Sequence, residues 1–167
     1  MENPRAVLLV DDDPDALDAL QQVIERSGVT CHKADNGPEA LNLLREQQVQ
    51  VVISDHDMPG MDGVELLKII ATRYPTVCRI LLTARRDAET SVRAINIAQA
   101  YRFISKPCRA NDLLTTLYFA FEGAEREAEN RRLAAQLRRA QALLTEVRRR
   151  APGVVEEIEK AQPATTV

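Results

Sequence analysis

The sequence predicts an α/β protein with a parallel sheet, extended at its C-terminal end by a long helix. Over residues 6–121, short apolar runs alternate with segments of helical periodicity. Four of the apolar runs end on polar residues, and helical periodicity continues from about residue 109 to residue 150. Strands that alternate with helices of this length indicate right-handed βαβ units and therefore parallel pairing.

The first strand and helix are expected at residues 6–10 and 14–26. The strand is wholly apolar and stops on three carboxylates, Asp11-Asp12-Asp13. Leu17, Leu20, Val23 and Ile24 follow at helical spacing. Asp13 is a suitable N-cap, Pro14 fits the first helical position, and Gly28 follows the expected end.

A weaker strand is expected at residues 29–34, and Asn36-Gly37-Pro38 begins a second helix that ends near Gln47. The central strand, residues 51–55, is a β-branched run that ends on Asp55 and is followed at once by the Pro- and Gly-containing run 58–63. Such a strand is buried and delivers its last residue to a loop. A third helix is then expected over residues 64–73, before Pro75.

The fourth strand, residues 77–82, stops on Thr83, and the fifth, residues 101–105, stops on Lys106-Pro107. Between them, the apolar positions Val92, Ala94, Ile95 and Ala98 indicate a fourth helix. The last helix packs on the sheet through apolar residues at helical spacing, which are Leu113, Leu114, Leu117, Ala120 and Phe121.

The strand ends carry the chemistry, because ligands of open α/β sheets bind outside the carboxyl ends of the strands. Asp11, Asp12 and Asp55 would repel one another by roughly 4 kcal/mol per close pair unless a hard cation lay among them. Mg²⁺ is the expected cation. With the Thr83 hydroxyl and the Lys106 ammonium in reach, this is a phosphoryl-transfer site with Asp55 as nucleophile.

In order and spacing, this set resembles the receiver domain of two-component response regulators. The residues that carry the resemblance are Asp11-Asp12, Asp55, Met58-Pro59-Gly60-Met61-Asp62-Gly63, Thr83-Ala84 and Lys106-Pro107. It covers residues 5–121. It implies a flavodoxin-like (βα)5 doubly wound sheet of order 2-1-3-4-5, in which strands 1 and 3 are neighbours at the switch point.

The resemblance also implies the roles of individual residues. Asp55 is the phosphoacceptor, served by a sensor histidine kinase or a phosphotransfer protein. Asp12 binds Mg²⁺ directly, Asp11 through water, and Asp57 through its backbone carbonyl, while the Asp57 side chain points outward. Lys106, expected before a cis bond to Pro107, and Thr83 contact the phosphoryl group.

Thr83 and Phe103 are the expected switch pair. Arg85 and Cys108 depart from the common pattern of the family, in which a smaller residue and an aromatic residue stand at these positions. The resemblance further implies a signalling module that is not an enzyme and that catalyses only its own phosphorylation and dephosphorylation.

Simpler readings exist for most of these residues. The acids at 11–13 could serve only as a helix N-terminus, Thr83 as a strand-end hydroxyl, Lys106 as a solvated lysine, and Phe103 as a core residue.

Two alternative functions also exist. A haloacid-dehalogenase-like phosphohydrolase shares the D-x-D of residues 55–57, but Pro59 stands where that class needs Thr or Val. A receiver fold that is never phosphorylated and acts as a dimerising adaptor is the other alternative. His56 and His32 are expected to be surface and edge residues.

The C-terminal helix carries an apolar seam with 3-4-3-4-3 spacing, formed by Asn130, Leu133, Leu137, Ala140, Leu144 and Val147. An exposed seam needs a partner, and a parallel homodimer through about residues 124–150, with Asn130 in an a position, is the simplest expectation. Gly123 weakens the helix without ending it, and Arg126 interrupts the seam. The expected domains are 1–121 (receiver), 122–151 (coiled coil) and 152–167 (a tail, with a short helix at 154–161 and a disordered end).

Charge and cysteine content limit the partners and the compartment. The net charge is −3, yet residues 131–150 hold seven Arg and one Glu. Arg interspersed with Leu, without aromatics, favours a solvated coil face over a nucleic-acid site. Three widely spaced cysteines favour reduced thiols and the cytoplasm, and no segment suggests a signal peptide or a membrane span. The kinase, the signal, the output and any continuation past Val167 are not encoded in these residues.

Overall fold

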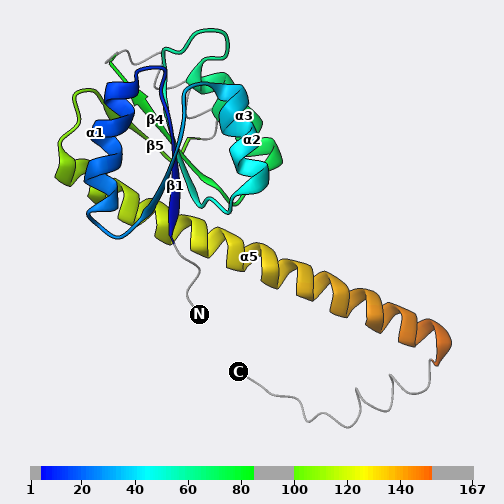
Figure 1. Ribbon diagram of the computed structural model, residues 1–167. Helices are drawn as coiled ribbons and strands as arrows, with labels where there is room; N and C mark the ends of the chain where they lie inside the picture. Colours follow the sequence, from blue (N-terminus) through cyan, green and yellow to red (C-terminus); the bar gives the residue numbers. More distant parts are fainter. Residues whose placement is uncertain (1–4, 85–99, 152–167) are drawn as a thin grey trace. The chain divides into compact units, whose positions relative to one another are not determined.

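The computed structural model describes residues 5–84 and 100–151. Its centre is a five-stranded parallel sheet of order β2-β1-β3-β4-β5, as predicted (Figure 1). The strands are β1 (Ala6–Val10), β2 (Thr30–Ala34), β3 (Val51–Asp55), β4 (Cys78–Thr83) and β5 (Arg102–Ser105). The bounds agree with the sequence-based prediction to within a residue. The expected helix between β4 and β5 and the C-terminal tail lie outside the described residues.

Helices cover both faces of the sheet. The helices α2 (Gly37–Glu46) and α3 (Gly63–Arg73) share one apolar core with the sheet (Figure 1). The helix α1 (Pro14–Glu25) and the first turns of α5 (Ala110–Arg150) share the other. Because β1 and β3 are buried on both faces, they are apolar throughout, apart from Ser54 and Asp55 at the end of β3.

The helices begin where side chains can satisfy free backbone amides. The Asp13 carboxylate accepts hydrogen bonds from the amides of Asp15 and Ala16 at the start of α1. Asp62 and Glu65 form a reciprocal capping box at the start of α3. These caps fix the points at which the loops after β1 and β3 join their helices.

The long helix α5 runs without a break through Gly123 over 41 residues. The chain divides into two compact units, residues 1–127 and 128–167. In the first unit, α5 is buried through residues such as Leu113, Leu117 and Phe121. In the second, the seam residues Leu133, Leu137 and Leu144 are 51–60% exposed. The apolar face of residues 128–150 is therefore uncovered in the single chain.

The remaining sequence-based expectations concern cysteines and membranes. Cys31, Cys78 and Cys108 are free thiols, and Cys78 is buried. Burial raises the pKa of Cys31 to about 12 and that of Cys78 to about 11. Within the described ranges, no helix combines the length and the apolar content that a membrane span requires.

Candidate phosphoacceptor site

The register of the central strands brings two carboxylates together at one edge of the sheet. Val10 of β1 lies opposite Ser54 of β3, so the residues that follow them, Asp11 and Asp55, are neighbours. Asp11 is only 2% exposed and Asp55 only 7%. Together with the exposed Asp12, they offer carboxylate oxygens that all lie within 4.8 Å of one another. The two buried acids are held in place by the sheet itself.

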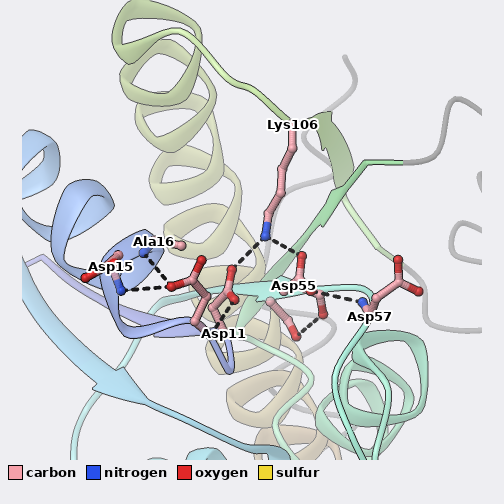
Figure 2. A network of polar contacts seen from close by, with 8 residues as sticks. Asp11, Asp15, Ala16, Asp55, Asp57 and Lys106 are labelled. Atoms are coloured by element: carbon pink, nitrogen blue, oxygen red, sulfur yellow. Dashed lines mark hydrogen bonds and ion pairs between the residues drawn. The ribbon is translucent and has the colours of Figure 1, made fainter.

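The ammonium of Lys106 lies between the two buried carboxylates (Figure 2). Its Nζ is 2.7 Å from Oδ2 of Asp11 and 2.6 Å from Oδ1 of Asp55. Burial lowers the pKa of Lys106, but the hydrogen bonds and the negative charges of Asp11 and Asp55 outweigh burial, and the net pKa is raised. Lys106 is therefore charged at neutral pH and offsets much of the repulsion between the acids.

The end of β4 supports the lysine. The backbone amide of Lys106 donates a hydrogen bond to the carbonyl of Thr83 at 2.9 Å. The peptide bond between Lys106 and Pro107 is cis, as the family resemblance implied. Thr83 is 2% exposed, whereas the small side chain of Ala84, which follows it, is exposed. The strand next to β3 thus ends in a buried hydroxyl residue followed by an exposed alanine.

The loop after β3 holds Asp55 from the other side. The amide of Asp57 donates a hydrogen bond to Oδ2 of Asp55 at 3.0 Å, whereas the ammonium of Lys106 contacts the other carboxylate oxygen, Oδ1 (Figure 2). Gly63 lies so close that a Cβ there would overlap the backbone carbonyl of Asp55 and would lie 2.9 Å from the Leu81 side chain. The Gly63 amide also donates to the carbonyl of His56. Only glycine fits at this position.

The donor set suits a hard divalent cation. Three carboxylates with oxygens within 4.8 Å, two of them buried, match the all-oxygen ligation that Mg²⁺ prefers. The exposed Asp12 leaves one side of the group open to solvent, and Mg²⁺ usually keeps several water ligands. The residues therefore fit Mg²⁺. Two of the carboxylate oxygens, one on Asp11 and one on Asp55, already contact the ammonium of Lys106.

Comparison with known proteins gives a family for this arrangement. Residues 7–118 match the family model described as the response regulator receiver domain. The chain belongs to that family.

Solved receiver domains share both the fold and part of the sequence. The signal receiver domain of an HD domain-containing protein from Pseudomonas fluorescens is 38% identical, with a TM-score of 0.71 over 74% of this chain and 98% of the other. A CheY-like receiver domain protein from Methanospirillum hungatei is 30% identical, with a TM-score of 0.71 over 75% of this chain and 99% of the other.

Curated relatives are longer proteins. The C4-dicarboxylate transport transcriptional regulatory protein DctD of Rhizobium meliloti is 39% identical over 138 residues, which are 81% of this chain and 28% of that protein. The hydrogenase transcriptional regulatory protein HoxA of Cupriavidus necator is 35% identical over 79% of this chain and 27% of its own length. The receiver-domain chain thus spans little more than a quarter of the length of these relatives.

The structure describes three of the four other expected residues of the receiver domain, Asp57, Phe103 and Cys108. Asp57 points outward, with its side chain 57% exposed and its Oδ1 3.6 Å from Nδ1 of His56. Phe103, on β5, is 38% exposed and is not a core residue. Arg85 lies outside the described residues, and Cys108 is partly buried beside the core that contains α1 and α5.

Sequence reasoning missed two features of the receiver domain. The prediction that His56 lies at the surface is wrong, since its side chain is only 14% exposed. Its amide donates to the carbonyl of Leu82 and so extends the β3–β4 ladder by one residue, which holds His56 inward. The second feature is the packing of Gly63 on Asp55, whose signal was the glycine after Asp62 in the loop sequence.

Proposed function

We propose that Asp55 accepts a phosphoryl group from a sensor histidine kinase or a phosphotransfer protein, with Mg²⁺ bound by Asp11, Asp12, Asp55 and the backbone carbonyl of Asp57. One observation carries this proposal: a buried carboxylate, two further carboxylates and an ammonium meet at one edge of the sheet. The family of the chain supports it, since a receiver domain is a signalling domain.

Each residue has a defined task in the transfer. An oxygen of Asp55 attacks phosphorus in line as the P–N bond of the donor phosphohistidine breaks, and the imidazole nitrogen takes up a proton. Asp11, Asp12, Asp55 and the carbonyl of Asp57 would hold Mg²⁺, which when bound would supply charge neutralisation at the phosphoryl oxygens. Lys106 adds a second positive charge, and the Asp57 amide, already on Oδ2, keeps the carboxylate oriented. The small side chain of Ala84 would leave room beside the phosphoryl group.

The response to phosphorylation is assigned to Thr83 and Phe103. The Thr83 hydroxyl would bond a phosphoryl oxygen, and Phe103, now 38% exposed, would move toward the space that Thr83 leaves. A phosphoryl group that contacts only one of two arrangements shifts the equilibrium between them. The alternative function, an adaptor that is never phosphorylated, does not explain why two acids are buried beside a charged lysine.

Phosphate uptake tests the assignment. The protein is incubated with Mg²⁺ and acetyl phosphate, or with beryllofluoride as the mimic, and its intact mass is measured. We expect one acid-labile phosphoryl group on the native chain, none on Asp55→Asn, and normal uptake by Asp62→Asn, a control that alters an acid outside the site and keeps its capping ability. Stoichiometric modification of Asp55→Asn would disprove the assignment, and no uptake by the native chain would favour the adaptor.

The seam of α5 carries the second part of the proposal, homodimerisation through about residues 124–150. Leu133, Leu137, Leu144 and Val147 are 41–60% exposed, and a row of this kind on a helix is stable in water only when covered. The chain would then form the input part of a longer cytoplasmic regulator, with a receiver domain of residues 1–121, a coil of residues 122–151 and a tail. The length and the names of the relatives support a longer regulator. A monomeric mass by light scattering at tens of micromolar, phosphorylated or not, would contradict it.

A further inference from the structure

The direction of pairing follows from charge, which the apolar seam alone does not decide. Residues 122–129 of α5 hold four Glu and one Arg, whereas residues 131–150 hold seven Arg and one Glu. The helix is thus acidic where the seam begins and basic where it ends. With Asn130, Leu137 and Leu144 in a positions, the flanking e and g positions are fixed for the whole seam.

Parallel pairing makes poor use of these positions. A g residue then faces the e residue five positions later in the partner, so Glu122 would face Glu127 and Glu129 would face the uncharged Ala134. No pair of opposite charge forms, and like charges meet on both sides of the coil. In the seam, Ala140 would face Ala140 of the other copy, which leaves the centre of the coil under-filled.

Antiparallel pairing fills the same seam better. An a residue then faces a d residue, and with the seam centred between residues 138 and 139 every layer is complete. The small Ala140 faces the large Leu137, and Leu133 faces Leu144, each pair occurring twice by symmetry. Each of the two central layers therefore pairs a large side chain with a small one, which fills the middle of the seam better than two facing alanines do.

The same register matches the charges at the flanking positions within residues 127–150. In an antiparallel pair, e faces e and g faces g. Glu129 then meets Arg150 at g, and Glu127 meets Arg148 at e, so the two-fold axis generates four pairs of opposite charge and none of like charge. The remaining flanking positions are Ala134 with Gln141 and Gln136 with Leu143, which are uncharged. We propose that the seam of residues 130–147 pairs antiparallel with a second copy of this chain.

Three features weigh against this register and are smaller. Glu127 is half-buried in the single chain and interacts electrostatically with Arg79. In the single chain, Glu129 lies 3.7 Å from Arg132, and Arg150 lies 2.6 Å from Glu146. Exposed pairs of this kind contribute little and exchange readily for pairs across an interface. Asn130 would bond with Asn130 of the partner only in a parallel coil, but it occupies the end layer of the seam, where water can satisfy it in either direction.

The inference rests on the self-association proposed above and changes what phosphorylation can do to the coil. At 1.5 Å per residue, residue 128 of the two copies would lie about 30 Å apart along the axis. The two copies of Asp55 would then act on opposite ends of the coil. A change at either receiver domain would loosen or tighten its own end, without sliding two adjacent helix bases past each other.

Disulfide mapping tests the direction. Asn130→Cys and Val147→Cys are made separately in the full chain and oxidised alone and as a mixture, with the native chain as the control for Cys31 and Cys108. In the proposed register residue 130 faces residue 147, whereas two copies of residue 130 lie about 25 Å apart along the axis, beyond disulfide reach. We expect crosslinks from residue 130 to residue 147 in the mixture only.

Charge reversal gives an independent measurement. Glu129→Arg should raise the dimer dissociation constant by about 3- to 30-fold, since two exposed pairs are lost. Combining Glu129→Arg with Arg150→Glu should restore the native dissociation constant. A general loss of helix stability could not produce this rescue. Crosslinks between two copies of residue 130, or no rescue, would overturn the antiparallel arrangement and leave self-association standing. A monomer at every concentration would overturn both.

Discussion

Removal of the Lys106 ammonium should separate its structural role from its competition with Mg²⁺. In Lys106→Met the aliphatic stem is kept while the charge on Asp11 and Asp55 is lost. The side chains of these two residues are 3% and 9% exposed, and their oxygens lie 2.7 and 2.6 Å from Nζ, so two charge-assisted hydrogen bonds disappear. The lysine side chain is itself 31% exposed. Discounted for solvent, the free energy of unfolding without metal should fall by about 2 kcal/mol.

Mg²⁺ should reverse this loss. The ammonium occupies oxygens that the cation needs, so Lys106→Met should bind Mg²⁺ more tightly than the native chain does, and a ligand that binds only the folded state stabilises it. Urea unfolding with EDTA and with millimolar Mg²⁺ measures both effects. Lys33→Met is the matched control, because the Lys33–Asp18 pair is as short, at 2.6 Å, but lies at the surface with side chains 36% and 62% exposed.

The control should lose less than about 0.5 kcal/mol and show no Mg²⁺ dependence beyond that of the native chain. Equal losses in the two lysine variants would mean that the buried acids do not depend on Lys106. An unchanged response to Mg²⁺ in Lys106→Met would mean that the metal does not use the oxygens of Asp11 and Asp55. Either result would refute the account of the site given above.

Three further predictions follow from the packing. Gly63→Ala should reduce both stability and phosphate uptake severely, because its Cβ would overlap the backbone of Asp55. Gly60→Ala has open space around it and a φ of +81°, so it should lower the free energy of unfolding by only about 1 kcal/mol and keep phosphate uptake. Equal effects of the two variants in urea unfolding would contradict this. Because the pKa of Cys31 is raised from 9.0 to about 12, the stability gained from its partly buried neutral thiol is complete below pH 9 and is lost as the pH rises from 9 to 12. If the free energy of unfolding of Cys31→Ser falls with pH as steeply as that of the native chain, this prediction is wrong. Arg5→Ala should cost about 1 kcal/mol, less at high salt, because Arg5 bonds two glutamates of α5 and lies over two of its aromatic rings; a salt-independent loss would exclude the ionic part.

The sequence by itself determined the strands and the identity of the residues at their carboxyl ends, and the family resemblance supplied the order of the strands in the sheet. Apolar runs such as Ala6–Val10 and Val51–Asp55 carry no competing helical pattern, and each is closed by local signals such as the Asp13 cap or the Pro59-Gly60 turn. Local chemistry acts over a few residues. It can therefore be recognised without knowledge of the rest of the chain.

The tertiary structure decided what those residues contact. That Lys106 bridges Asp11 and Asp55, that His56 is held inward by the β3–β4 ladder, and that Gly63 packs against the backbone of Asp55 all depend on segments far apart in the sequence. Distances of this kind are set by strand register and helix packing, which no single stretch contains. The sequence named the charged groups, and only the fold fixed which of them neutralise one another.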